Sequence, residues 1–324
     1  MRVVLESGRR VALHRTTKRT AWLAAEGIDP GAEERVVAFC HCAPGAGMFD
    51  PDPVQTQSMG VTLLSVDRPG YGGSDPVSAG QWPTVGSAAG ELAGVLDALG
   101  IERIGVVGWS AGGRVALALA ALRPDLVDRV VVVATPAPDD EIPWVAPEQR
   151  TELERLRELT PAEALAELSE RLRSLVPSDP FSAEALWLLA AVTSDEPALR
   201  GAGVRNRLGE MLRTAFAQGA GGLAADIAGY CLQPWGFEPE EVLAKTLLLY
   251  GSHDPIAGPA HGRWWEARLP DASLEVVPEA GHLLVVPMWS RILSHVAPGR
   301  RHLRSLAVAQ KLDPDIDVEE FSAA

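Results

Sequence analysis

Short, unbroken runs of apolar residues recur along the chain. Five of them, which lack the polar–apolar alternation of a half-exposed strand, occupy residues 35–39, 61–67, 104–109, 127–135 and 245–251. Strands buried on both faces have this pattern, because helices cover both sides of a parallel sheet. Two β-branched runs that flank Ser7-Gly8 predict an antiparallel hairpin at the N-terminus.

Helical patterns lie between these runs. They occupy residues 82–99, 111–122, 261–269 and 284–296. The first ends at Gly100 and the second stops before Pro124, as helices usually do at such residues. Strands that alternate with helices in this way predict an α/β protein with a mostly parallel, doubly wound sheet.

One long section breaks the alternation. Between residues 136 and 239 there is no convincing strand, only helical segments at 147–159, 161–176, 182–193 and 204–218. A helical block inserted between two sheet strands is expected to sit as a lid at one end of the sheet. We therefore expect a core of residues 1–135 and 240–298, a helical lid over 136–239, and a C-terminal extension over 299–324.

Composition and charge narrow the range of partners. The 324 residues are 47% hydrophobic and carry a formal net charge of −14. This charge argues against nucleic acid or an anionic membrane surface as the main partner. The three cysteines cannot all pair and show no C-x-x-C spacing, so they predict neither a disulfide framework nor a zinc site. No signal-peptide apolar region and no run long enough to span a bilayer is visible, so we expect a reduced, cytoplasmic protein.

The strongest chemical signal is the pattern G-x-S-x-G at Gly108, Ser110 and Gly112. It follows a predicted buried strand directly and precedes a predicted helix. Such a strand–turn–helix arrangement holds a serine in strained backbone geometry above the sheet, where only small neighbours fit. We predict that Ser110 is a nucleophile. The alternative is a glycine-rich turn with an incidental serine.

A serine hydroxyl needs a base and an orienting carboxylate, each in a loop after a later strand. Asp254 stands just beyond the run at 245–251, and His282 stands beyond the final strand, behind a glycine. We predict these two as the acid and the base. The alternative for Asp254 is a helix cap before Pro255. The remaining histidines are less suitable as the base because of where they lie. His14 and His41 precede Ser110, and His253 and His261 lie on the loop of Asp254 and the helix after it. His295 lies in a helix and His302 in the tail.

Acyl transfer also needs backbone N–H donors where a carbonyl oxygen becomes negative. The residue after the nucleophile, Ala111, should supply one of these donors. The loop FCHCAPGAGMFD, which follows the run at 35–39, should supply the other, and we predict Ala43 for this role.

With these motifs the chain resembles the α/β-hydrolase superfamily, in the lidded serine-hydrolase branch of esterases, lipases and epoxide-hydrolase-like proteins. The likeness covers roughly residues 3–298. That family's loop usually contains His-Gly-x-Pro, whereas this chain has His41-Cys42-Ala43-Pro44. Because glycine adopts backbone angles that cysteine does not, the nearby Gly45 and Gly47 are expected to absorb the change. Cys42 is either a small buried thiol, the preferred interpretation, or a second nucleophile.

The resemblance implies an α/β-hydrolase fold with an inserted helical lid, and no metal or organic cofactor. The expected reaction is hydrolysis of an ester, thioester or lactone with an apolar part through an acyl-enzyme. A serine nucleophile argues against haloalkane dehalogenases and epoxide hydrolases, which use aspartate at that position. Two alternatives stay open: a lyase or cofactor-free oxidative enzyme that reuses the triad, and a non-catalytic small-molecule-binding homologue. The sequence leaves the oligomeric state open.

Overall fold

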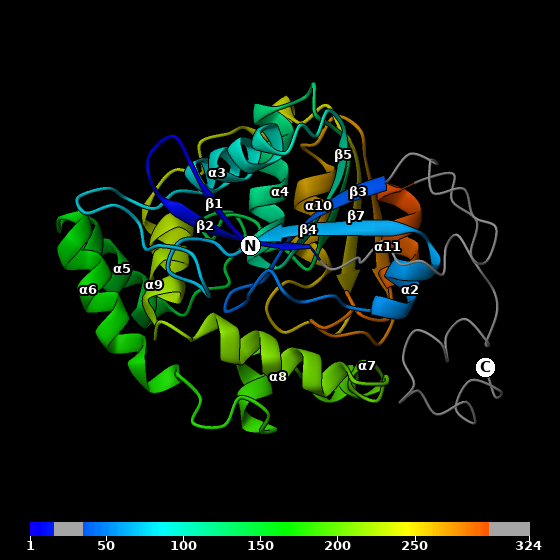
Figure 1. Ribbon diagram of the computed structural model, residues 1–324. Coiled ribbons are helices and arrows are strands. Elements are labelled where there is room, and N and C mark those ends of the chain that lie inside the picture. Colours follow the sequence, from blue (N-terminus) through cyan, green and yellow to red (C-terminus); the bar gives the residue numbers. More distant parts are fainter. Residues whose placement is uncertain (16–34, 298–324) are drawn as a thin grey trace.

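The computed structural model describes residues 1–15 and 35–297. Its centre is an eight-stranded sheet in the order β1-β2-β4-β3-β5-β6-β7-β8 (Figure 1). The N-terminal hairpin is antiparallel, β2 runs antiparallel to β4, and all later neighbours are parallel, which confirms the predicted mostly parallel sheet. The strands are β1 Arg2–Val4, β2 Arg10–Arg15, β3 Arg35–Cys40, β4 Val61–Val66, β5 Ile104–Trp109, β6 Val127–Val133, β7 Lys245–Gly251 and β8 Ala272–Val277.

Helices cover both faces of the sheet. On one face α2 (Pro53–Ser58) and α11 (Trp289–Val296) pack against each other, while α3 (Val85–Ala98) packs on α4 (Ala111–Leu122). The helix α10 (Pro259–Glu266) lies against β7 and β8. Every residue of β4 and β5 is buried. Burial of both faces therefore accounts for the unbroken apolar runs of these strands.

Two helix predictions were wrong in their extent. The pattern at 284–296 gives a helix only from Trp289, because Pro287 has no N–H to donate and the preceding residues form separate turns. The segment at 182–193 forms a 3₁₀ helix over Glu184–Leu189, which ends where Ala190 takes a left-handed conformation (φ 54°). Apolar spacing predicted helical character there but not the type of helix.

Residues 136–239 contribute helices and no strand to the sheet, and we call them the helical insertion. Its α-helices are α5 Pro147–Arg157, α6 Pro161–Leu172, α7 Glu196–Leu199, α8 Val204–Ala215 and α9 Gly221–Ile227. In Figure 1 α5, α6 and α9 lie together to the left of the sheet, and α7 and α8 lie below it. The glycine-rich start of α9 gave no helical signal in the sequence.

The insertion packs by two apolar clusters. One joins α5, α6 and α9 through Leu156, Leu168 and Ala224. In the other, Leu208 and Met211 of α8 belong to the same buried core as the sheet strands. The insertion is therefore seated on the sheet domain by apolar contacts. In the described parts of the chain no helix is long and apolar enough to cross a membrane. The predicted extension over 299–324 lies outside the described residues.

Candidate active site

The turn between β5 and α4 carries Ser110 in an unusual backbone conformation. Its φ is 54° and its ψ is −121°, a region that costs a non-glycine residue about 1–3 kcal/mol. The flanking glycines are required by close approach. A Cβ atom on Gly112 would lie 2.0 Å from the Cys40 carbonyl oxygen, and one on Gly108 would lie 2.4 Å from the Cα of Gly113. The geometry is the strained turn that the G-x-S-x-G pattern predicts.

Ser110, His282 and Asp254 form one chain of hydrogen bonds. The His282 Nε2 atom lies 2.9 Å from Ser110 Oγ, and His282 Nδ1 lies 2.8 Å from Asp254 Oδ2. All three residues are buried, each with at most 9% of its surface exposed. Three side chains that are far apart in the sequence, each from a loop after a strand, thus meet in the order that a proton transfer from serine requires.

The carboxylate of Asp254 is ionised. Burial alone would raise its pKa, but His282 and the N–H groups of Ile256 and Ala257 outweigh burial and lower the pKa below the usual value. An ionised carboxylate can only accept, so His282 Nδ1 carries the proton of that hydrogen bond. In the neutral ring this leaves Nε2 free to accept the proton of Ser110. Asp254 does not cap α10, whose N-cap is Gly258.

The loop of His282 is held from two sides. The indole Nε1 of Trp109 donates to the His282 carbonyl oxygen at 3.0 Å, from the strand that leads to Ser110. The N–H of Leu283 donates to Asp195 Oδ1 at 2.9 Å, and Asp195 belongs to the insertion. Burial raises the pKa of Asp195. No sequence signal marks this residue, because an aspartate next to Glu196-Pro197 suggests only a helix cap.

The two proposed oxyanion donors, Ala43 and Ala111, lie at the start of the loop after β3 and of α4. Within the described residues the backbone N–H of neither donates to a protein acceptor. Cys42, the residue before Ala43, is 2% exposed and donates its thiol proton to the Pro44 carbonyl oxygen at 3.1 Å. Burial raises its pKa, so the thiol stays protonated. These contacts support the interpretation of Cys42 as a small buried side chain.

Three of the other described histidines are engaged elsewhere, and His253 is exposed. His261 Nδ1 accepts from the N–H of Ala137, and His295 Nε2 bonds the carbonyl oxygen of Lys245. His14 pairs with Asp67. In the described ranges no group of three or more histidine, cysteine or acidic side chains is placed to hold a metal ion.

A buried arginine lies one helical turn after Ser110 and was missed in the sequence. Arg114 is 2% exposed, and its guanidinium carbon lies 4.8 to 5.4 Å from the ring centroids of Trp144, Tyr230 and Trp235. Its Nη2 donates to the Pro136 carbonyl oxygen at 3.0 Å. No carboxylate of the described residues lies within ion-pair distance of it. The three rings therefore take the place of a counter-ion through cation–π contacts.

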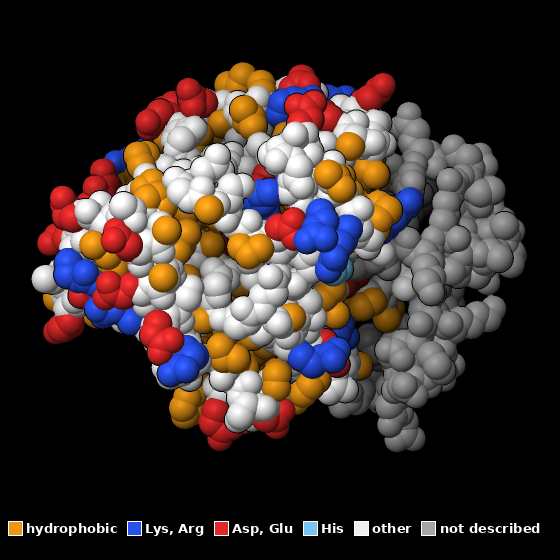
Figure 2. Space-filling model, turned by 60° about the vertical axis from the view of Figure 1, so that its left-hand side comes forward, with side chains coloured by type: hydrophobic (Ala, Val, Ile, Leu, Met, Phe, Trp, Pro, Cys, Tyr) orange, Lys and Arg blue, Asp and Glu red, His pale blue; other side chains and the backbone are white. Residues whose placement is uncertain are grey.

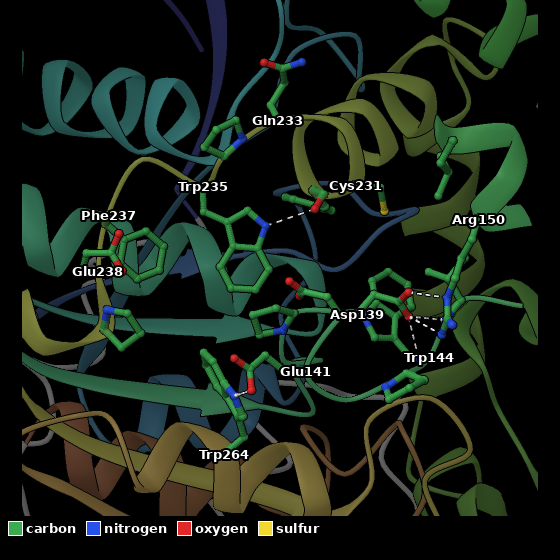
Figure 3. Close-up of a pocket in the computed structure, with 18 of the residues that line it drawn as sticks. Asp139, Glu141, Trp144, Arg150, Cys231, Gln233, Trp235, Phe237, Glu238 and Trp264 are labelled. Carbon is green, nitrogen blue, oxygen red and sulfur yellow. Dashed lines mark hydrogen bonds and ion pairs between the residues drawn. The ribbon is translucent and has the colours of Figure 1, made fainter. Parts of the chain in front are cut away.

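The outer side of these rings faces a groove of about 890 Å³, shown in Figure 3. Its lining comes from the two segments that connect the insertion to the sheet domain, from α5, and from Trp264 and Arg268 of α10 and the loop after it. Ser110, Asp254 and His282 do not line it. On the face shown in Figure 2, apolar side chains form small patches among charged ones rather than one continuous band.

The comparisons with known proteins agree with this architecture. The family model described as alpha/beta hydrolase fold matches residues 35–286. The chain belongs to this family. A solved hydrolase from Pseudomonas aeruginosa superposes with a TM-score of 0.63 at 21% identity, over 91% of this chain and 96% of that one. The predicted fold class and the resemblance to this family are thereby confirmed.

Two curated relatives match this chain over most of its length. The dihydrolipoyllysine-residue acetyltransferase component of an acetoin cleaving system from Cupriavidus necator is 30% identical over 264 residues. That match covers 78% of this chain and 60% of the relative, so the chain spans about three fifths of that protein's length. A 2-hydroxy-6-oxononadienedioate/2-hydroxy-6-oxononatrienedioate hydrolase from Cupriavidus pinatubonensis is 27% identical, over 78% of this chain and 82% of the relative.

Proposed function

We propose that the protein is a serine hydrolase that cleaves an ester, thioester or lactone through an acyl-enzyme. The observation that carries the proposal is the hydrogen-bond chain from Ser110 through His282 to Asp254, with distances of 2.9 and 2.8 Å. A buried serine in this arrangement has its own base, and the base has its own orienting carboxylate. A non-catalytic binding protein would have no need for all three.

The reaction follows from these positions. Ser110 Oγ attacks the substrate carbonyl carbon while His282 Nε2 takes the serine proton. The N–H groups of Ala43 and Ala111 donate to the carbonyl oxygen as it becomes negative. His282 then gives the proton to the leaving group, and a water molecule, activated by the same nitrogen, releases the acyl group from Ser110. Asp254 holds the histidine ring and stabilises its charged form without taking the proton.

The helical insertion is proposed to act as the lid, with the boundaries expected from the sequence, 136–239. Two contacts support this role. Asp195 accepts a hydrogen bond from the residue after His282, so the insertion lies directly against the candidate site. Buried side chains of the insertion that pack on the sheet domain, such as Leu189, Leu208 and Phe216, are apolar. These apolar contacts hold the insertion on the sheet domain. We propose a small-molecule acyl substrate with an apolar part, as the resemblance to lidded esterases and lipases implies.

A second candidate is hydrolysis of a carbon–carbon bond. It is favoured by the similarity to the Cupriavidus pinatubonensis hydrolase, which is 27% identical to this chain over most of both chains. In that case the same residues would act on a ketone carbonyl, and the leaving group would be a carbon rather than an oxygen or sulfur atom.

The experiment has two steps. A fluorophosphonate probe, which forms a covalent bond with an activated serine, should label the wild type and not Ser110→Ala. A separate, unlabelled sample of the wild type is then assayed with p-nitrophenyl esters of graded chain length, with acyl thioesters and lactones, and with 2-hydroxy-6-oxo-6-phenylhexa-2,4-dienoate. Turnover of an ester, thioester or lactone supports the first candidate, and turnover of the dienoate alone supports the second. Absence of labelling in the wild type would contradict both and favour a binding role.

A further inference from the structure

The loop after β4 buries an arginine that touches both the oxyanion loop and the helical insertion. Arg68 is 4% exposed. Its Nη1 donates to the His41 carbonyl oxygen at 2.6 Å and its Nη2 donates to the Cys42 carbonyl oxygen at 2.8 Å. The same guanidinium donates to Asp226 of α9 through Nε at 2.9 Å and Nη2 at 2.6 Å. One side chain therefore joins two backbone carbonyls of the sheet domain to a carboxylate of the insertion.

The Cys42 carbonyl oxygen is held from a second direction by His41. The backbone N–H of Arg68 donates to His41 Nε2 at 3.3 Å, so that nitrogen carries no proton. Burial and the Arg68 charge lower the pKa of His41 well below its usual value, and the ring is neutral. Its proton therefore sits on Nδ1, which donates to the Cys42 carbonyl oxygen at 2.7 Å. Both lone pairs of that oxygen are thus engaged by donors.

Fixing this oxygen fixes the direction of the next N–H. The only cis peptide bond in the described residues joins Ala43 and Pro44, so the bond between Cys42 and Ala43 is trans. In a trans peptide the C=O and N–H vectors point in opposite directions. The Ala43 N–H consequently points away from Arg68 and His41. The position of the Cys42 carbonyl also requires a glycine at residue 45, because a Cβ atom there would lie 2.5 Å from the Cys42 oxygen.

The carboxylate of Asp226 is itself held in place. It is 7% exposed, and the hydroxyl groups of Tyr71 and Tyr230 donate to it at 2.8 and 3.1 Å. Arg68, Tyr71 and Tyr230 thus bind one carboxylate on a helix of the insertion. If α9 moved off the sheet domain, Arg68 would lose its only ionic partner in the described residues, and a buried cation without a partner must rearrange or become hydrated.

We propose that Asp226 and Arg68 are positioning residues that let the helical insertion set the oxyanion hole. This inference rests on the proposed serine-hydrolase function. With the insertion seated, Asp226 orients Arg68, Arg68 holds the Cys42 carbonyl, and the Ala43 N–H faces the developing oxyanion. With the insertion displaced, the Cys42 carbonyl is no longer held and the Ala43 N–H no longer points at the oxyanion. The site is therefore complete only when the insertion covers it.

The test separates turnover from binding. Removing one oxyanion donor lowers kcat by about 10²–10³-fold, and a misdirected donor loses part of this. Asp226→Asn keeps the size of the side chain but removes its charge, and Gly45→Ala pushes on the Cys42 carbonyl without touching the ion pair. For each we expect kcat to fall about 10–10²-fold while KM stays within about threefold. Fluorophosphonate labelling to completion counts the intact Ser110 sites, so that kcat is expressed per working site.

The matched control is Glu91→Gln, which weakens a partly buried ion pair between Glu91 of α3 and Arg9 of the N-terminal hairpin, neither of which belongs to the oxyanion loop. It should leave kcat within twofold of the wild type. A normal kcat in both Asp226→Asn and Gly45→Ala overturns the inference, as does a rise in KM alone, which would mean that Asp226 only seats the insertion. These outcomes are distinct from a failure of the proposed function, in which the wild type itself is neither labelled nor active.

Discussion

Replacement of Asp254 by asparagine tests the candidate site most directly. The change alters one atom of a side chain whose two oxygens have separate tasks. Oδ1 accepts from the N–H groups of Ile256 and Ala257 at 2.8 and 2.9 Å, while Oδ2 accepts from His282. An asparagine oxygen can keep the two backbone hydrogen bonds. Its NH₂ group then faces His282 Nδ1.

The magnitude follows from this geometry. An NH₂ group can only donate, so it favours the histidine tautomer in which Nδ1 accepts and Nε2 carries the proton. A protonated Nε2 cannot accept the proton of Ser110. The cost in turnover for this tautomer error reaches about 10⁴-fold in a known serine protease, and we expect at least about 10²-fold here.

The assay compares turnover with folding stability. Because both backbone hydrogen bonds of the 256–257 turn survive, Asp254→Asn should melt close to the wild type while kcat falls. Ester hydrolysis and a thermal melt on the same preparation measure the two quantities. Near-normal turnover would refute the assignment of Asp254, and the acid would then be sought after β6, at Asp139 or Asp140. In the structure Asp139 instead binds Arg150 and the N–H groups of Trp144 and Val145.

Three further predictions concern single side chains. Ser110→Ala should lose probe labelling and about 10³-fold or more of turnover while staying folded, and unchanged hydrolysis would contradict the nucleophile. Cys42→Gly should keep turnover within about tenfold, because only backbone groups act in that loop; a loss as large as that of Ser110→Ala would reveal a chemical role for the thiol. Burial raises the pKa of Asp50 to about 7, so its folded form holds a proton that the unfolded chain releases above about pH 4. The Asp50 carboxyl should therefore lower the stability of the wild type relative to Asp50→Asn as the pH rises from about 4 to 7. In denaturant titrations Asp50→Asn should be more stable than the wild type at pH 8 by at most about 4 kcal/mol, a difference that vanishes near pH 4. Equal stability of the two proteins at pH 8 would contradict the raised pKa of Asp50.

The sequence predicted the sheet well because its signal is local. The apolar runs at 61–67 and 104–109 can be interpreted without reference to distant residues, because an unbroken apolar run by itself indicates a strand buried on both faces. The three residues Ser110, Asp254 and His282 could be chosen for a related reason. In this fold the loops after successive parallel strands open at the same edge, so order along the chain translates into proximity in space.

The contacts of the insertion with the site could not be predicted in this way. Asp226 and Arg68 are 158 residues apart, and Asp195 and Leu283 are 88 apart. Which face of a lid helix meets which loop depends on how the insertion packs, and no periodicity in the sequence encodes that. Arg114 was missed because its helix appeared wholly apolar in the sequence, and because its aromatic partners come from two distant segments.

The position of Arg114 has a consequence for how the insertion can move. Trp144 lies in the segment that leads from the sheet domain into the insertion, and Trp235 lies in the segment that leads back. Both connecting segments therefore contact the same guanidinium group. A displacement of either connecting segment would expose the Arg114 charge, which the three aromatic rings now cover. We therefore expect the insertion to tilt about this point, with the smallest excursion at the two tryptophans and the largest at its far helices. Amide hydrogen exchange should accordingly be slow beside Trp144 and Trp235 and faster along α6.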